Sequence, residues 1–193
     1  GVIGKYFSTG NYVLSDVYIS VLEAIKHAAW ANDRQPEIHW INSEDFEEDP
    51  SKINELDNLD GIVIPGGFGT RGIEGKILAI KHARENKIPY FGLCYGMQCA
   101  VIEYARNVLG WSDANTEEMD PETRHLMIHF MEGQRSNTEE GKYGGTLRLG
   151  SWPCHIKPHT VAAKAYGTTR IEERHRHRYE FNNEHREALE LAG

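Results

Sequence analysis

PYFGLCYGMQ, residues 89–98, joins a short apolar run to an amphipathic pattern through a cysteine that has a glycine two residues away on each side. The run before Cys94 predicts a buried strand, and the apolar spacing after it predicts a helix that begins just beyond the cysteine. Gly92 and Gly96 lack the Cβ atoms that would obstruct so sharp a turn. We therefore predict a strand–turn–helix elbow that presents Cys94 at the N-terminal end of a helix.

The predicted position of Cys94 suits a nucleophile. The positive end of the helix dipole is expected to lower the pKa of the thiol and to favour the reactive thiolate. The backbone N–H of Tyr95 would then be free to stabilise an oxyanion on the carbon under attack. The alternative is an inert cysteine buried at the end of a strand, which is how most free cysteines behave. The paired glycines favour the nucleophile.

Strands and helices alternate along the first half of the chain. Apolar runs predict strands at residues 2–7, 38–41 and 61–64 and before Cys94. Helical spacing predicts helices at about 17–29, with Ser15 or Asp16 as N-cap, and at 73–85, with a short helix around Ile53 and Leu56. This alternation predicts an α/β fold with three layers, a mostly parallel sheet flanked by helices, as in flavodoxin-like proteins.

The second half of the chain is more polar. Within the polar stretch 113–145 we expect an exposed loop at residues 137–142. We also expect a strand at 144–150, a short helix at 161–166, an extended or irregular segment at 174–181 and a helix at 184–191. No shift in composition marks a boundary, so the sequence predicts a single domain over residues 1–193.

Composition excludes several classes of protein. The formal net charge of −8 argues against binding to nucleic acid or to a membrane surface. Three cysteines without framework spacing favour a reducing compartment. No apolar run approaches the ~20 residues of a membrane span, and the first residues do not resemble a signal peptide. We expect a cytoplasmic protein.

Gly67–Gly72, GFGTRG, matches the G-x-G-x-x-G pattern of dinucleotide sites. The strand before it is not the first of the chain, however, and no acidic residue follows at the end of a second strand, so that interpretation is disfavoured. A glycine-rich loop beside a cysteine elbow has another use. Its N–H groups can supply a second oxyanion donor without interference from side chains.

Two further clusters invite functional interpretations. His125 and His129 stand four residues apart and would share one face of a helix, as zinc ligands often do, but we interpret them as a surface feature and expect no metal site. Arg174, Arg176 and Arg178 alternate along a predicted extended segment. They would form either a clamp for a carboxylate or phosphate or a solvated charged strand, and their pattern favours neither.

Six segments of the chain resemble, in the same order, the class I glutamine amidotransferase (glutaminase) domains of CTP synthases. They are GKY at 4–6, PGGFG at 65–69, GLCYGMQ at 92–98, ARNV at 105–108, GGTLRLG at 144–150 and ERHRHRYEFN at 173–182. Many class I amidotransferases share the glycine–cysteine–glycine elbow. The last two segments are much more specific to CTP synthases.

The resemblance implies that Cys94 attacks the side-chain amide of L-glutamine, releases ammonia and leaves a glutamyl thioester for water to hydrolyse. It implies oxyanion and substrate-binding roles for Gly67 and Tyr95. Gly96, Met97 and Gln98 would extend the same wall of the substrate site. It also implies that Glu118 binds the α-amino group of the substrate and that Arg178 binds its α-carboxylate. This role of Arg178 favours the clamp over the solvated strand.

For the full-length enzyme, the resemblance implies a synthetase domain that uses ATP and Mg to aminate UTP to CTP in pyrimidine biosynthesis. It also implies GTP as an allosteric activator and a homotetramer. No cofactor is expected in the glutaminase domain itself.

The sequence departs from the family pattern in two respects. The family's general base is a histidine in a His-Pro-Glu motif, which this chain lacks before its end at Gly193, and the synthetase domain that precedes the glutaminase domain is also missing. We therefore expect a C-terminally truncated domain that hydrolyses glutamine poorly or not at all. The alternatives are an impaired module for glutamine binding or assembly, and a related cysteine hydrolase of the same fold.

Overall fold

The structure is a computed structural model that describes residues 1–5, 8–9, 12–13, 18–131 and 148–193. The chain divides into two compact units. The first comprises residues 1–128 and 181–193, and the second comprises residues 129–180. Each unit is described by itself.

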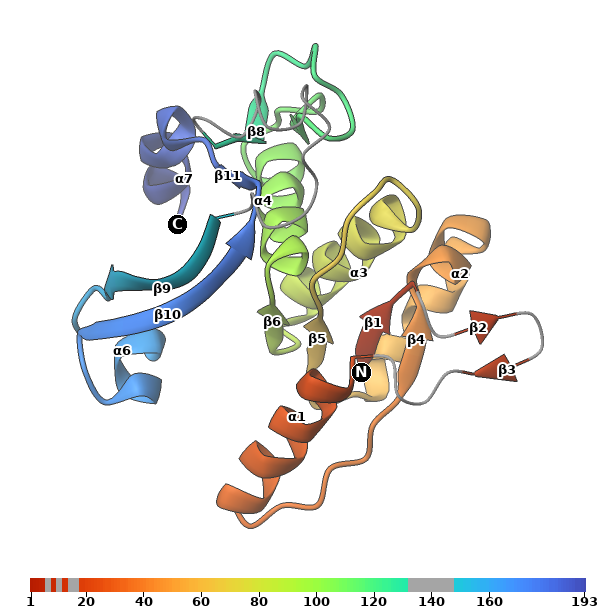
Figure 1. Ribbon diagram of the computed structural model, residues 1–193. Coiled ribbons are helices and arrows are strands. Elements are labelled where there is room, and N and C mark those ends of the chain that lie inside the picture. The colour runs from red at the N-terminus through yellow and green to blue at the C-terminus, as the bar shows by residue number, and fades with distance from the viewer. Residues whose placement is uncertain (6–7, 10–11, 14–17, 132–147) are drawn as a thin grey trace. The chain divides into compact units, whose positions relative to one another are not determined.

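The first unit is built on a parallel sheet of four strands in the order β4-β1-β5-β6 (Figure 1). The strands are β1 (Val2–Gly4), β4 (Trp40–Asn42), β5 (Ile62–Ile64) and β6 (Tyr90–Gly92). Each neighbouring pair is parallel, with Ile3 opposite Ile41 and Ile64 opposite Gly92. In this order the second strand lies outside the first, as in flavodoxin-like sheets. The predicted α/β fold with a parallel sheet is confirmed.

Helices flank this sheet (Figure 1). They are α1 (Ile19–Ala31), α2 (Ser43–Glu48), the 3₁₀ helix η1 (Pro50–Asn58), α3 (Ile73–Asn86) and α4 (Tyr95–Asn107). Leu22 of α1 is buried against Val2 of β1, with Ile25 and Trp40 packed around them. α3 packs against α2, η1 and α4. Burial of these apolar faces is the main force that holds the helices against the sheet.

One local prediction for this unit was wrong, and one helix was not predicted. Residues 43–48 form the unpredicted helix α2, because the Asn42 side chain accepts a hydrogen bond from the Glu44 N–H and Phe46 is completely buried. The strand before Cys94 was expected to be buried, yet Phe91 is 62% exposed. β6 is an edge strand of the described sheet and has a neighbouring strand, β5, on one side only. Ser15 and Asp16 lie outside the described residues.

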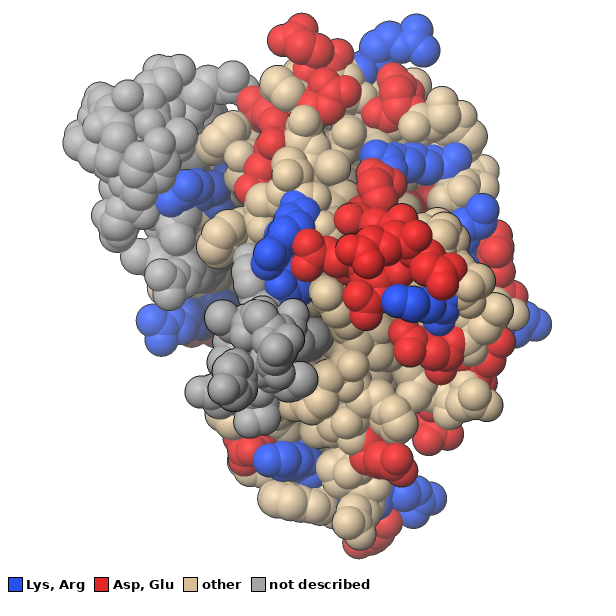
Figure 2. Space-filling view, turned by 90° about the vertical axis from the view of Figure 1, so that its right-hand side faces the viewer, with Lys and Arg blue, Asp and Glu red and all other residues tan. Residues whose placement is uncertain are grey.

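The surface of the molecule reflects its negative charge. Figure 2 shows one face on which acidic side chains gather with fewer basic ones among them. α2 alone contributes four acidic residues, Glu44, Asp45, Glu47 and Glu48. None of the helices that the structure describes is both long enough and apolar enough to cross a membrane.

The polar segment after α4 contains strands that the sequence did not indicate. β7 (Asn115–Thr116) pairs in parallel with β8 (Leu126–Phe130). β8 contradicts the helical face expected for His125 and His129, since His129 lies on this strand. His125 precedes it, stacks on Trp111 and contacts an Asp113 oxygen at 2.5 Å through Nδ1. The chain ends with η2 (Asn183–His185) and α7 (Arg186–Ala192), close to the predicted helix.

The second unit contains an antiparallel ribbon of β9 (Arg148–His155) and β10 (Arg170–His177), joined through α6 (Val161–Tyr166) (Figure 1). Thr160 caps α6 by accepting a hydrogen bond from the Ala163 N–H. β11 (Tyr179–Phe181) follows β10. The short helix is thus confirmed, and of the two conformations expected for residues 174–181 the extended one is observed. The loop expected at 137–142 and residues 144–147 of the expected strand lie outside the described part. The remaining strands, β2 (Ser8–Thr9) and β3 (Tyr12–Val13), pair with each other in the first unit.

Candidate active site

The elbow at Cys94 has the geometry that the sequence predicted. β6 ends at Gly92 and α4 begins at Tyr95. Cys94 has φ 52° and ψ −103°, a conformation that L-residues rarely adopt and that costs about 1–3 kcal/mol. The Gln98 N–H donates to the Cys94 carbonyl at 3.1 Å, which makes the cysteine the residue just before the helix. The thiol residue is exposed.

Both glycines of the elbow are required by close packing. A Cβ atom on Gly96 would lie 2.1 Å from the carbonyl oxygen of Ile64 on β5. A Cβ atom on Gly92 would lie 2.6 Å from the backbone nitrogen of Met97. Neither distance is sterically possible, so larger residues at these positions would force strand and helix apart.

The glycine-rich loop after β5 lies directly beside the cysteine. A Cβ atom on Gly66 would stand 3.4 Å from the Cys94 Cβ and 4.0 Å from its Sγ. A Cβ atom on Gly67 would stand 3.7 Å from Cδ1 of Tyr95. β5 and β6 are adjacent parallel strands, so the loop and the elbow meet at their carboxyl ends, where α/β sheets usually bind ligands.

Three side chains hold this loop. Glu118 accepts a hydrogen bond from the Gly69 N–H at 2.9 Å, and the Tyr95 hydroxyl donates to the Gly69 carbonyl at 2.6 Å. Lys5 Nζ donates to the carbonyls of Phe68 and Gly69. The contacts bring Glu118, predicted to bind an amino group, to the loop that lies against Cys94.

The electrostatics of Cys94 correct one prediction. Desolvation by the surrounding protein raises the pKa of its thiol, and the negative charge of Glu118 raises it further. A hydrogen bond from the Tyr95 backbone N–H lowers the pKa; this effect is weaker than desolvation but stronger than the effect of Glu118. The expected fall in the pKa was therefore wrong. The N-terminus of α4 does favour the thiolate, but less strongly than desolvation disfavours it.

The other predicted site residues fall into two groups. On α4, Gly96 and Gln98 are buried, whereas Met97 is exposed. Arg178 belongs to the second unit, where its carbonyl accepts a hydrogen bond from the Met131 N–H at 2.9 Å. The assigned roles of these residues remain predictions.

Sequence reasoning missed two lysines that border the site. Lys5 is 4% exposed and contacts the glycine-rich loop, and Lys76 on α3 is completely buried. The sequence did carry a signal for Lys76. It stands three residues after Ile73 and four before Ile80, which places a charged side chain on the apolar face of the helix.

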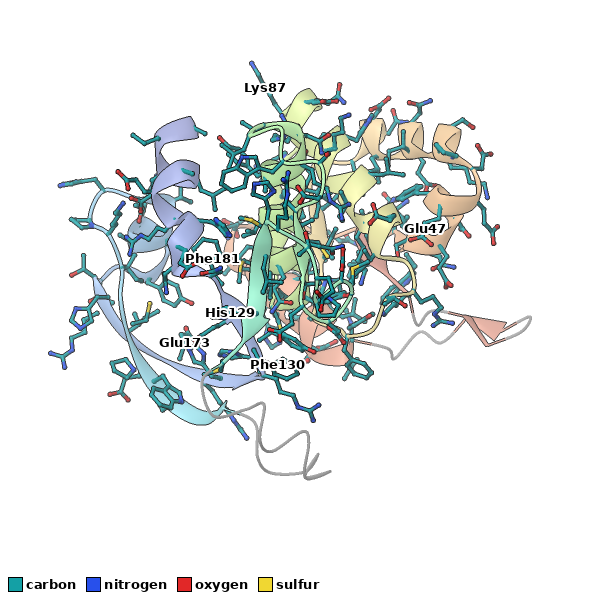
Figure 3. The ribbon with its side chains drawn as sticks, turned by 90° about the horizontal axis from the view of Figure 1, so that it is seen from above. Glu47, Lys87, His129, Phe130, Glu173 and Phe181 are labelled. Carbon is teal, nitrogen blue, oxygen red and sulfur yellow. The ribbon has the colours of Figure 1, made fainter. Side chains whose placement is uncertain are left out.

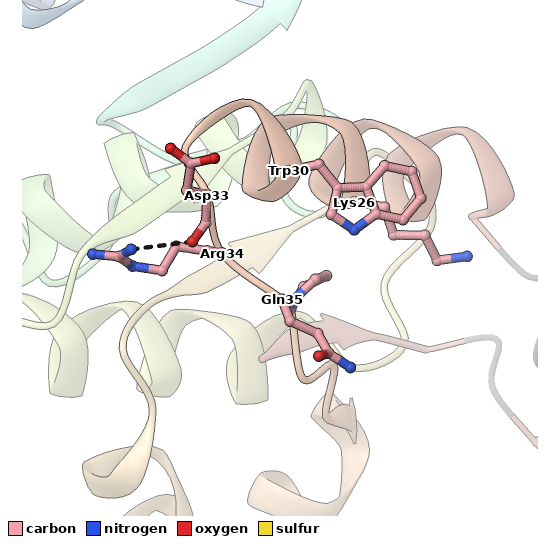
Figure 4. A pocket seen from close by; sticks show the side chains of 6 residues that line it. Lys26, Trp30, Asp33, Arg34 and Gln35 are labelled. Carbon is pink, nitrogen blue, oxygen red and sulfur yellow. Dashed lines mark hydrogen bonds between the residues drawn. The ribbon is translucent and has the colours of Figure 1, made fainter.

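A separate hollow lies at the C-terminal end of α1 (Figure 4). Its volume is about 480 Å³, and its lining comprises Lys26, Trp30, Asp33, Arg34, Gln35 and Pro36. The Arg34 Nη1 donates to the Asp33 carbonyl at 3.1 Å, as the dashed line in Figure 4 marks. None of the predicted site residues lines this hollow.

Comparisons with known proteins agree with the geometry. The sequence model of the family "Glutamine amidotransferase class-I" matches residues 13–192. The CTP synthase of Listeria innocua is 54% identical over all of this chain and 35% of its own length, and that of Staphylococcus saprophyticus is 52% identical over all of this chain and 34% of its own length. The chain thus spans about a third of the length of these curated relatives.

One solved structure is similar to this chain in three dimensions. The glutaminase domain of Trypanosoma brucei CTPS with bound acivicin matches with a TM-score of 0.87 and 40% sequence identity. The match covers all of this chain and 71% of that chain. The chain therefore belongs to the class I glutamine amidotransferase family, and within that family it is similar to the glutaminase domains of CTP synthases.

Proposed function

We propose that this chain hydrolyses L-glutamine slowly through a thioester on Cys94 and so produces ammonia. The main support for the proposal is that Cys94 and Glu118 both contact the glycine-rich loop after β5. This loop lies against Cys94 at Gly66 and is bonded to Glu118 at Gly69. An exposed nucleophile and a carboxylate suited to an ammonium group therefore belong to one rigid arrangement, as an amino acid substrate requires.

The proposed reaction balances with water alone. Cys94 Sγ bonds to the amide carbon, and the carbonyl oxygen becomes an oxyanion that the backbone N–H groups of Gly67 and Tyr95 stabilise. The C–N bond then breaks, and the proton lost by the thiol leaves with the nitrogen as ammonia. Water adds to the thioester, the C–S bond breaks, and glutamate and the thiol are released.

The two ends of glutamine would be bound by opposite charges. Glu118 receives the α-ammonium group in this proposal, and Arg178 pairs with the α-carboxylate, which a guanidinium binds through two parallel hydrogen bonds. The wall formed by Gly96, Met97 and Gln98 would contact the aliphatic part of the substrate. The exposure of Met97 at the start of α4 supports that role.

We infer further that the ammonia serves a synthetase domain that aminates UTP to CTP with ATP, as part of a CTP synthase. The support is the name of the relatives, which match the whole of this chain. The proposal for the longer protein rests on that similarity, since this chain spans about a third of their length.

A second candidate is a module that binds glutamine without hydrolysing it. The raised pKa of Cys94 favours this candidate, because less of the thiol is ionised at neutral pH. The two candidates differ in the reactivity of that one sulfur.

Covalent labelling by acivicin, the glutamine analogue bound in the structural relative, tests the proposal. Mass spectrometry of peptides reports which cysteine reacts, and exposed Cys154 serves as an internal control. We expect acivicin to modify Cys94 and not Cys154, and L-glutamine to slow the labelling at least tenfold. Equal labelling of both cysteines, or labelling that glutamine does not slow, would overturn the proposal.

A further inference from the structure

Lys76 is the most unusual charged residue of the first unit. Its side chain is completely buried on α3, and its Nζ lacks a hydrogen-bond partner among the described residues. An ammonium group in that position is costly, because burial removes its water and none of the described carboxylates forms an ion pair with it. The site proposed above does not use this charge.

The surroundings of Lys76 connect it to the two proposed oxyanion donors. Its Nζ lies 5.1 Å from the centroid of the Tyr95 ring, within the range of a cation–π interaction. A Cβ atom on Gly67 would stand 3.9 Å from the same Nζ. The ammonium is thus located behind the glycine-rich loop and beside the first residue of α4.

Three other titratable groups act on Lys76. Lys5 Nζ lies 5.5 Å from the centroid of the same Tyr95 ring. Cys99 is buried on α4, and Glu47 of α2, which Figure 3 labels, accepts a hydrogen bond from the Gly75 N–H at 3.1 Å beside α3. Burial raises the pKa of Cys99 to about 12, so this thiol is neutral near pH 8.

Burial is also the main influence on Lys76 itself. Desolvation lowers the pKa of Lys76 to about 8; the charge of Lys5 lowers it too, while the charge of Glu47 raises it. The group therefore changes its charge just above neutral pH. A charge enclosed by protein acts over several ångströms with little screening by water.

We propose that Lys76 is a positioning residue for the oxyanion site: its buried ammonium fixes the Tyr95 ring and the Gly67 backbone, and it favours negative charge in front of their N–H groups. This inference rests on the proposed glutaminase function and deepens it. Lys76 acts through Tyr95 and Gly67, without contact with the substrate.

Two reactions of Cys94 separate this role from a merely structural one. Acylation by saturating L-glutamine passes through an oxyanion, whereas alkylation by iodoacetamide displaces iodide and forms none. Both reactions need the thiolate, so the fraction of Cys94 that is ionised cancels in the ratio of their rates. The ratio is measured for the unmodified chain, for Lys76→Met and for Lys81→Met, a control on the same helix.

We expect the ratio for the unmodified chain to fall about tenfold as the pH rises through 8, because the ammonium is lost. Lys76→Met should show the low ratio already at pH 7 and no step at pH 8. Lys81→Met should behave like the unmodified chain. An equal ratio and an equal pH profile for Lys76→Met and the unmodified chain would overturn the inference. Absence of any glutamine-dependent acylation in the unmodified chain would instead refute the proposed function.

Discussion

The backbone N–H of Gly69 donates a hydrogen bond to the Glu118 carboxylate over 2.9 Å, although the two residues are 49 positions apart in the sequence. The bond fixes the carboxylate to the loop that lies beside Cys94. The Glu118 side chain therefore has two effects. It is the proposed partner of the substrate's amino group, and its charge contributes to the raised pKa of the thiol.

The variant Glu118→Gln tests both effects, each by its own measurement. The amide retains an oxygen that can accept the Gly69 hydrogen bond but has no charge. We expect the pKa of Cys94 to fall, so that iodoacetamide modifies this thiol a few-fold faster at pH 7. Protection of Cys94 by L-glutamine should disappear in the same variant. A thiol of unchanged reactivity that glutamine still protects would show that neither effect belongs to Glu118.

Gly96→Ala tests the close packing of the elbow. The added methyl group would lie 2.1 Å from the Ile64 carbonyl, so we expect a loss of at least ~2 kcal/mol in the free energy of unfolding. Gly67→Ala is the matched control for stability, because its Cβ atom would meet Tyr95 at an ordinary 3.7 Å. Urea denaturation measures both values. Equal stability of the two variants would contradict the packing described for α4 and β5.

The buried charge of Lys76 should appear in the pH dependence of stability. The pKa of this lysine is about 8 in the folded protein and 10.5 as its ordinary value, a difference that corresponds to about 3 kcal/mol. Below pH 8 the residue is charged in both states, and the full cost of burying the charge is present. The cost diminishes as the pH rises from 8 to 10.5, because only the unfolded chain then binds the proton.

Lys76→Met should therefore be more stable than the unmodified chain below pH 8, and the difference should vanish by pH 10.5. Denaturant unfolding at a series of pH values measures this difference, and Lys81→Met serves again as the control. A difference that does not change with pH would mean that Lys76 has the same pKa in the folded and the unfolded chain.

Arg84 and Glu103 join α3 to α4 through a buried carboxylate. Arg84 donates to both oxygens of Glu103 at 2.8–3.2 Å, and the Glu103 side chain is only 1% exposed. Arg84→Ala leaves that carboxylate without its cation and should cost about 2 kcal/mol, since the guanidinium is itself partly exposed. Arg186→Ala removes an exposed pair with Glu190 and should cost less than ~0.5 kcal/mol. Similar losses in the two variants would argue against a special role for the buried pair.

The elbow could be predicted from the sequence because its requirements are local. Two glycines and a cysteine at fixed spacing leave few alternatives, and apolar spacing indicated both ends of α3 and the start of α4 to within a residue. α2 was missed because an acidic segment with a single buried Phe46 lacks an apolar periodicity, and its cap at Asn42 is a weaker signal.

Features that depend on contacts between distant segments could not be predicted in this way. The exposure of Phe91 follows from the position of β6 at the end of the sheet, which strand order decides. The pKa of Cys94 depends on desolvation and on Glu118, whose approach requires the folded loop. Lys76 was visible as an anomaly on α3, but its proximity to Tyr95 emerges only when the two helices are packed.

A glutamyl thioester on Cys94 is the intermediate that the proposed reaction requires, and it can be detected directly. The chain is mixed with isotopically labelled L-glutamine, quenched with acid at short times and digested, and the label on each cysteine peptide is measured together with released ammonia. We expect label on Cys94 and none on Cys154, and we expect Cys94→Ser to abolish both the label and the ammonia. Ammonia released by Cys94→Ser at the rate of the unmodified chain, or glutamine bound with neither label nor ammonia, would contradict the account.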